Sequence, residues 1–272
     1  MCSSEANKDK DFDWRFDLEQ NAFVCELISM GQAVEMWDGE TLTYEDLLKD
    51  NPHRAFVVAI GYRTLKIVDR FKSLNILDRM LAYEGFPIKT PAGSIFRDQW
   101  IRVTNDVLLS RLTSIRDCCF FLVAEIFEMG LKPRKVTLGN LKKHIQNQTI
   151  IEVLNEIGDT AREIRDERDR HLHRGEERPL FGELDLIFQV MAWHENKSEI
   201  KGYDSDEDGR QIELDLHQMH EQATSEIRAK YHRSGDRLLT LTEKLFELTQ
   251  PEFERRWSDK RDIAKEVRNW ER

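Results

Sequence analysis

The chain has 272 residues, which is enough for one large domain or two small ones with a hydrophobic core of ordinary size. Hydrophobic residues make up 40% of it, and only 13 Gly and 6 Pro are present, so a disordered chain and a turn-rich β-sandwich or barrel are both disfavoured. The 51 acidic side chains outnumber the 41 basic ones and give a formal net charge of -10. This balance argues against a protein that coats nucleic acid through its overall charge, although a local basic cleft is compatible with it.

The apolar stretches are too short for a membrane protein. The most apolar one, Cys118–Phe127, is shorter than a bilayer span and includes Glu125. The first residues contain no apolar run of the kind found in a secretory signal. Four cysteines in a chain of this length do not form a disulfide framework. We therefore expect a cytoplasmic protein with reduced thiols and no membrane partner.

The N-terminal part of the chain, residues 1–90, is predicted to form a helical extension. Residues 13–36 mix apolar and charged positions in a loosely helical pattern, and a connector with turn-forming residues follows. A long helix is predicted from Pro52 to about Glu84, because proline is favoured at the first position of a helix. The loop 87–94, which contains two prolines, is the clearest internal boundary.

Residues 91–272 are predicted to form the main helical bundle. Its clearest helix carries an apolar seam with alternating spacings of four and three residues, which is typical of a helix that packs against a partner. A short helix over Leu138–Gln146 follows, and the same spacing then returns in a helix that begins near Ile150. The seam of the first of these helices consists of Leu108, Leu112, Ile115, Cys119, Leu122 and Ile126.

The last third of the chain is predicted to be helical with interruptions. An apolar helix is expected over 181–193, followed by an acidic surface loop. A helix or helix pair is expected over 214–249, with Ser234-Gly235 as a possible break, and a charged helical tail over 251–272. No internal repeat and no convincing β alternation are found, so the sequence predicts an all-α, antiparallel helical bundle.

One segment departs from these apolar patterns. Residues 162–174 read REIRDERDRHLHR. At about 100° per residue, the apolar stripe that includes Ala161 and Ile164 extends to Arg168 and His171, so a guanidinium and an imidazole occupy the core-facing side. Burial of such groups is costly unless they are paired or line a cleft. Arg binds phosphate with paired donors and His exchanges protons near neutral pH, which together suit phosphodiester chemistry without a metal.

The stretch Arg168-Asp169-Arg170-His171-Leu172-His173 resembles the signature of HEPN domains (higher eukaryotes and prokaryotes nucleotide-binding), in which an Arg and a polar residue are followed after a short spacer by a His. The continuation Arg174-Gly175 is also common in prokaryotic members. The resemblance covers about residues 94–249 and implies a HEPN-like bundle. It also implies a metal-independent endoribonuclease of a prokaryotic defence or toxin–antitoxin type. Such proteins act on RNA as homodimers with a composite site, and some are paired with an antitoxin protein.

Carried over to this chain, the resemblance implies a role for individual residues. His173 would transfer the proton as a ribose 2′-OH attacks its own phosphate. Arg168 would stabilise the charge of the phosphorane, and Asp169 would orient the site. Substrate binding would fall to Arg165 and Arg174. The resemblance implies no cofactor.

Two alternatives stay open for this segment. Arg165 and His171 also have family-compatible spacing, so either His171 or His173 can be the catalytic histidine. The segment can equally be a solvated helix end with Glu–Arg pairs, or belong to a non-catalytic interaction module as an ion-pair network or nucleotide-binding site.

Metal sites are less favoured by the sequence. One acidic stretch matches much of a calcium-loop spacing, but it has Asp at the last ligand position where Glu is usual, so an acidic surface loop is the preferred interpretation. His217 and His220, with Glu213 one turn before, form at most half of a metal site. The residues with calcium-loop spacing are Asp204, Asp206, Asp208, Gly209 and Asp215.

Overall fold

The computed structural model describes residues 15–36, 52–174 and 207–270, and helices dominate these ranges. This confirms the prediction of an all-α protein. The predicted helix over 181–193 lies outside the described residues. The helices are α1 (Ala22–Met36), α3 (Pro52–Leu81), α4 (Arg97–Ile126), α5 (Leu138–Leu141), α6 (Gln148–Arg174) and α8 (Glu207–Trp270), with a 3-10 turn at Pro133–Lys135.

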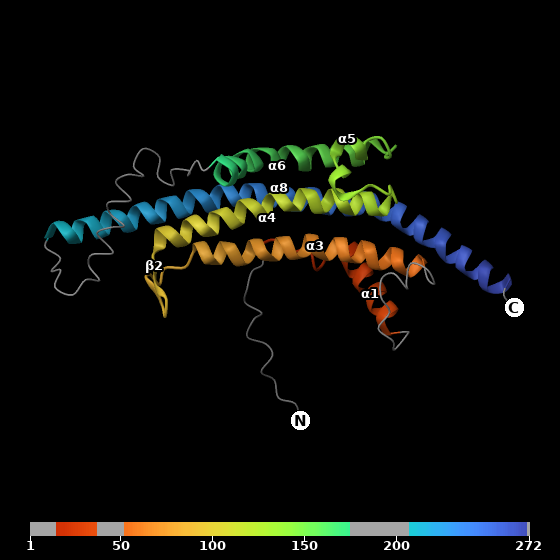
Figure 1. Cartoon of the computed structure of the whole chain (residues 1–272), viewed down its shortest axis with the longest axis horizontal. Coiled ribbons are helices and arrows are strands. Elements are labelled where there is room, and N and C mark those ends of the chain that lie inside the picture. The colour runs from red at the N-terminus through yellow and green to blue at the C-terminus, as the bar shows by residue number, and fades with distance from the viewer. Residues whose placement is uncertain (1–14, 37–51, 175–206, 271–272) are drawn as a thin grey trace, which may run out of the picture.

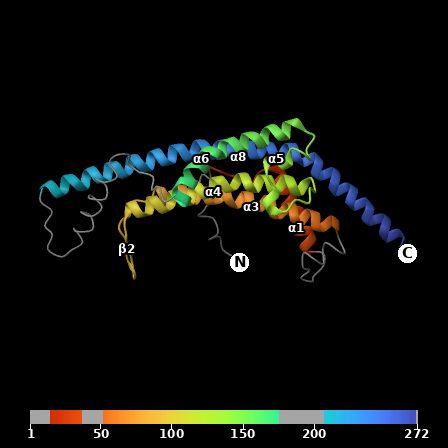
Figure 2. The ribbon, with the colours of Figure 1, turned by 45° about the horizontal axis from the view of Figure 1, so that its top comes forward.

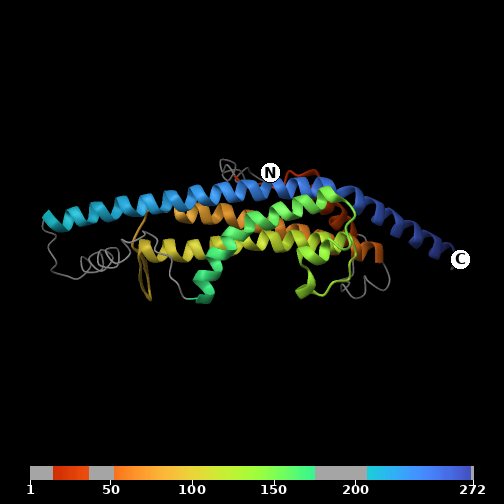
Figure 3. The same cartoon turned by 90° about the horizontal axis from the view of Figure 1, so that it is seen from above.

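The long helices form an antiparallel bundle, because α3, α4, α6 and α8 reverse direction one after another (Figure 1). Contacts join α3 to α4, α4 to α6 and α6 to α8, and α8 also packs on α3 and α4. In the turned views α8 runs the whole length of the bundle and extends past the other helices at both ends (Figures 2 and 3). Among the helices of the described residues, none combines the length and apolarity that a membrane crossing needs.

Helix α4 lies at the centre of the hydrophobic core, as its sequence predicts. It packs against α3, α6 and α8, so an apolar seam on one side is not enough and a wider apolar surface is required. Every residue of the predicted seam is buried, and Phe120 and Val123 widen the buried surface. The helix begins at Arg97 and ends at Ile126.

Helix α8 corrects the prediction of a break at Ser234-Gly235. It is a single helix of 64 residues that continues through this pair and through Pro251, so the predicted tail is part of the same helix. Glycine and proline lower helix propensity locally, but packing against α1, α3, α4 and α6 outweighs that cost. At Gly235 the missing side chain serves packing, since a Cβ atom there would lie 2.6 Å from the ring of Phe16.

A short hairpin in the predicted loop 87–94 also corrects the sequence interpretation, which found no β structure. Strand β1 (Ile88–Thr90) pairs antiparallel with β2 (Gly93–Ile95), and Ile88 is opposite Ile95. Gly93 has φ +135°, a conformation that side-chain-bearing residues rarely adopt. The strands are too short to show the alternation on which a prediction depends. The hairpin reverses the chain between α3 and α4.

Candidate functional site

The apolar stripe of α6 is buried as predicted, and it ends in a carboxylate. Ala161 and Ile164 lie in the core, and the next residue on this side, Glu167, is only 5% exposed. Its Oε2 forms an ion pair with Nζ of Lys230 on α8. Among the described side chains of the segment, Glu167 is therefore the most buried charged one. Arg168, which the sequence places in the stripe, is partly exposed. Pairing with a cation makes this burial tolerable.

A small cavity borders this ion pair. Its volume is about 20 Å³, enough for one water molecule, and its lining includes Asn105, Glu167, Lys230 and Tyr231. The Tyr231 hydroxyl is buried without a hydrogen-bond partner among the described residues, and burial raises the pKa of this hydroxyl. A cavity of this size does not admit a substrate. The ion pair of Glu167 with Lys230 joins α6 to α8.

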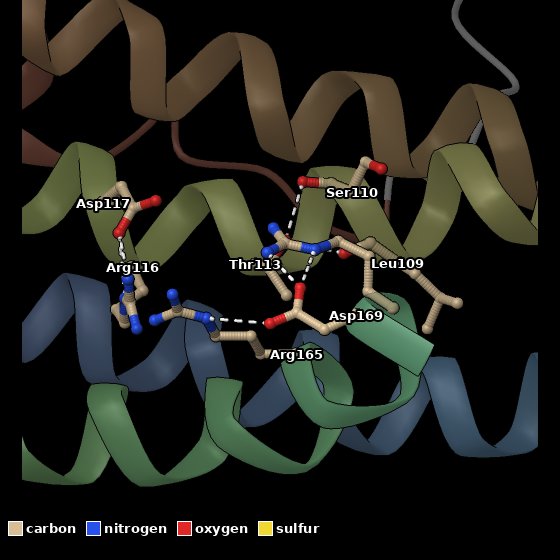
Figure 4. A network of polar contacts seen from close by, with 8 residues as sticks. Leu109, Ser110, Thr113, Arg116, Asp117, Arg165 and Asp169 are labelled. Atoms are coloured by element: carbon tan, nitrogen blue, oxygen red, sulfur yellow. Dashed lines mark hydrogen bonds and ion pairs between the residues drawn. The ribbon is translucent and has the colours of Figure 1, made fainter. Parts of the chain in front are cut away.

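Arg168 is fixed by contacts on both sides of its guanidinium. Its Nε and Nη2 donate to Oδ1 of Asp169 at 3.0 and 2.6 Å, and its Nη1 donates to Oγ1 of Thr113 on α4 at 3.0 Å. Thr113 in turn donates to the backbone carbonyl of Leu109 at 2.9 Å. Figure 4 shows Asp169 between the helix that carries Thr113 and the side chain of Arg165. These bonds use only part of the donor capacity of a guanidinium.

Arg165 contacts the same carboxylate as Arg168. Its Nε lies 3.5 Å from Oδ2 of Asp169, one helical turn along α6, so these two positions share one side of the helix. One carboxylate therefore faces two guanidiniums, and the trio keeps a net positive charge. The backbone of α6 stays helical through His171, His173 and Arg174, whose side chains are not among those that the structure describes.

A second polar cluster was not identified from the sequence. Asp78 on α3 accepts from Nε and Nη2 of Arg228 at 2.9 and 3.0 Å, and its Oδ1 lies 2.8 Å from Nε2 of His232. Burial alone would raise the pKa of Asp78, but the hydrogen bonds from Arg228 and His232 outweigh burial and lower the pKa. Arg228 and His232 are four residues apart on α8, a detectable spacing, but nothing in the sequence indicates their partner on a distant helix.

The metal patterns of the sequence receive no support from the local structure. Asp204 and Asp206 of the calcium-loop pattern lie outside the described residues. Asp208, Gly209 and Asp215 lie in the helical backbone of α8, whereas a calcium loop needs a sharp turn at its central glycine. His217 is exposed and lies 3.8 Å from a carboxylate oxygen of Glu221. Within the described ranges, no three or more His, Cys, Asp or Glu side chains are grouped so as to hold a metal ion.

No protein-family model, no curated protein and no solved structure matches this chain. Similarity to known proteins therefore assigns no role to these residues.

Proposed function

We propose that this protein is a HEPN-like, metal-independent endoribonuclease whose site is built from the end of α6. The observation that carries the proposal is the position of Arg168. Its guanidinium is fixed by Asp169 and by Thr113 of α4, it is partly exposed, and its bonds to described residues leave part of its donor capacity unused. A fixed arginine with free donors is suited to bind a phosphate group and to stabilise the charge that develops on it.

The proposed reaction is an internal transesterification of RNA. His173, or His171 in the other register, accepts the proton of a ribose 2′-OH, and the 2′-oxygen attacks the adjacent phosphorus. The bond from phosphorus to the 5′-oxygen breaks, and that oxygen takes up a proton. The products are a 2′,3′-cyclic phosphate and a 5′-hydroxyl end. Arg168 stabilises the phosphorane, and Arg165 and Arg174 bind the flanking phosphates.

The helical geometry favours a site shared by two copies of the chain. α6 remains helical to Arg174, so positions 168 and 173 are separated by about 140° around its axis. A single helix therefore does not direct both positions toward one phosphate. In a homodimer with two α6 ends side by side, Arg168 of one copy and His173 of the other can face the same phosphate.

The test is cleavage of a labelled single-stranded RNA by the purified full chain in EDTA, with DNA of the same sequence as a substrate that lacks the 2′-OH. Arg168→Ala and His173→Ala are each expected to reduce the rate by about 10²–10⁴-fold. Arg162→Ala is the matched control, because Arg162 is an exposed arginine of the same helix, paired with Asp159. It is expected to leave the rate unchanged.

Mixing the two inactive variants tests the shared site directly. A heterodimer of Arg168→Ala and His173→Ala chains contains one intact Arg and one intact His, so partial recovery of cleavage is expected. Cleavage that only His171→Ala abolishes would place the site in the other register. Cleavage of DNA, or equal rates for wild type and the Arg168→Ala variant, would contradict the proposal.

One observation favours a second candidate, a non-catalytic interaction module. Asp169 already binds both Arg165 and Arg168 within the chain, as expected for an ion-pair network that stabilises the end of α6. Under this alternative the wild type does not cleave RNA, and Asp169→Asn lowers the free energy of unfolding. Under the nuclease proposal, Asp169→Asn chiefly lowers the cleavage rate.

A further inference from the structure

The loop that joins α4 to α6 carries a concentrated positive charge. Its residues 129–147, called the basic loop, contain Lys or Arg at five positions and no Asp or Glu, although the whole chain has a formal net charge of -10. All five basic side chains are exposed, and so is His144. The five are Lys132, Arg134, Lys135, Lys142 and Lys143. The acidic balance of the chain therefore does not extend to this loop.

The basic loop is a folded element with its own hydrogen bonds. Within its 3-10 turn the backbone N–H of Lys135 donates to the carbonyl of Lys132 at 2.7 Å. Nδ2 of Asn140 donates to the carbonyl of Lys135 at 2.8 Å, which joins this turn to α5. Leu141 and Ile145 are buried in the hydrophobic core and anchor the loop. Because the backbone is fixed in the free protein, little of its conformational freedom is lost when a ligand contacts this surface.

The five basic side chains of the loop form no ion pair with a carboxylate of the described residues. Lys143 donates instead to the uncharged amide oxygen Oδ1 of Asn140 at 3.2 Å. Glu128, which directly precedes the loop, already faces two cations of α8. Its Oε2 lies 3.1 Å from Nη1 of Arg256, and its Oε1 lies 2.7 Å from Nζ of Lys260. Within the described part of the chain, the positive charge of the basic loop is therefore not neutralised.

Local charge, rather than net charge, determines what this surface attracts. At physiological salt the Debye length is about 8 Å, so acidic side chains on remote parts of the bundle act only weakly on a group bound at the basic loop. Clustered cations repel one another, and a bound row of phosphates replaces that repulsion by attraction. A polyanion therefore fits this surface, whereas a single small anion contacts only a part of it.

The other side chains of the basic loop select among polyanions. The loop has no Phe, Tyr or Trp on which a base could stack, so it is suited to the phosphates of a nucleic acid and not to its bases. A membrane-binding surface needs exposed apolar side chains that insert among the lipids. In the basic loop the large apolar side chains are buried (Leu141, Ile145) or pack partly buried against the core (Met129, Leu131, Val136, Leu138). A nucleic acid therefore fits the loop better than an anionic membrane.

The basic loop lies within reach of the end of α6. Arg168 binds Thr113, and from Thr113 α4 continues to its end at Ile126 for about 20 Å at 1.5 Å per residue. In Figure 3 the loop and the end of α6 both extend past α4 on the side away from α8. A single strand with stacked bases, at about 3.4 Å per nucleotide, covers this distance with about six nucleotides. One strand can therefore contact both.

We propose that the basic loop binds the phosphate backbone of single-stranded RNA, without base specificity, so that the same strand reaches Arg168 at the end of α6. The choice of RNA rests on the proposed ribonuclease function, whereas the charge and the position of the loop do not depend on it. Binding at the loop supplies affinity, and the end of α6 supplies the chemistry.

The test is fluorescence anisotropy of the full chain with a labelled single-stranded RNA in which every 2′-OH is methylated, so that binding is measured without cleavage. The five-site variant, in which Gln replaces all five basic side chains of the loop, is expected to bind roughly tenfold or more weakly at about 100 mM KCl. The slope of log Kd against log[KCl] is expected to fall by about 0.7 for each phosphate contact that is lost. DNA of the same sequence is expected to bind similarly, because it offers the same phosphates.

Two double variants control for net charge. Lys142→Gln/Lys143→Gln and Arg15→Gln/Lys72→Gln change the net charge of the chain by the same amount. Arg15 and Lys72 lie outside the basic loop, and each is paired with a carboxylate. Only the loop variant is expected to bind RNA more weakly. Both are expected to melt close to wild type, because substitutions of surface side chains change stability little.

No binding by wild type, equal binding by the five-site variant, or an equal loss in the control double variant would overturn the proposal. So would tighter binding to poly-glutamate or to phosphatidylserine vesicles than to RNA, which would assign the loop to an acidic protein or to a membrane. With ordinary RNA, the five-site variant is expected to raise KM and leave kcat nearly unchanged. RNA binding without cleavage by wild type would contradict only the proposed ribonuclease. Cleavage with an unchanged KM in the five-site variant would contradict only the binding role of the basic loop.

Discussion

Replacement of Gly235 by Ala tests the packing of α8 on the N-terminal segment. Gly235 lies in the interior of α8, and an ideal Cβ there would lie 2.6 Å from both Cε1 and Cζ of Phe16. The Phe16 ring is 1% exposed and packs against Phe71 and Tyr231, with ring centroids 6.3 and 5.8 Å away. A ring enclosed in this way cannot move aside without disturbing its neighbours.

Two opposing effects determine how much Gly235→Ala changes the free energy of unfolding. Ala is favoured over Gly in a helix interior by about 0.8–1.0 kcal/mol, whereas an added group in a filled core costs about 1–3 kcal/mol. The net expectation for Gly235→Ala is a loss of about 0–2 kcal/mol in the free energy of unfolding. Gly61 is the matched control, because it lies within α3 and has no atom within 4 Å of an added Cβ. Gly61→Ala is expected to stabilise the protein by up to about 1 kcal/mol.

Urea unfolding followed by circular dichroism measures both variants. The difference between them isolates the steric cost, since the gain in helix propensity is common to both. Substitution of Phe16 by Leu in the Gly235→Ala background is expected to recover part of the loss, because a smaller side chain leaves room for the methyl group. A Gly235→Ala variant as stable as Gly61→Ala would refute the reasoning, and so would the absence of any recovery with Leu at position 16.

Two further predictions concern buried polar groups. Asp78→Asn is expected to cost about 2 kcal/mol at neutral pH, because it removes the charged acceptor of Arg228 and His232. The pKa of Asp78 is lowered in the folded state from 3.8, so its contribution to stability is complete above that value and is lost as the pH falls through the folded pKa. For the thiols, burial raises the pKa of Cys119 to about 12, so iodoacetamide at mildly alkaline pH is expected to modify the exposed Cys25 but leave Cys119 intact, as peptide mass mapping would show.

Each of these predictions has a control or a contradicting result. Asp69→Asn, on the exposed side of α3, is expected to change the free energy of unfolding very little. If the difference between wild type and Asp78→Asn stayed the same at acidic pH, the charge of Asp78 would not be its source. If Cys119 reacted as fast as Cys25 in the folded protein, the core around α4 would be more open than its burial indicates.

Periodicity in the sequence was sufficient to predict the helical class, the core-facing side of α4 and that of α6 as far as Ile164. The α4 seam and the α6 stripe repeat at the spacing of a helix, and such repeats are local properties of the chain. The beginning of α3 at Pro52 follows from local chemistry as well. The ion pair of Arg165 with Asp169 is likewise a local feature that a sequence pattern can indicate, because its two members lie one turn apart on the same helix.

Only the tertiary structure determined which partners the polar groups have and how far α8 extends. Arg168 binds Thr113, Glu167 binds Lys230 and Asp78 binds Arg228, and each pair joins two helices that are distant in sequence. No local pattern specifies such a pair, because its energy comes from proximity after folding.

The same holds for Gly235 and Arg97. The local propensity of Gly235 indicates a break, but the Phe16 ring packed against it makes glycine the residue that fits an unbroken helix. Arg97 is an ordinary charged residue in the sequence. Only the packing of three helices around it makes it a buried cation beside a pocket. Burial and desolvation are properties of the whole fold, so a sequence pattern does not contain them.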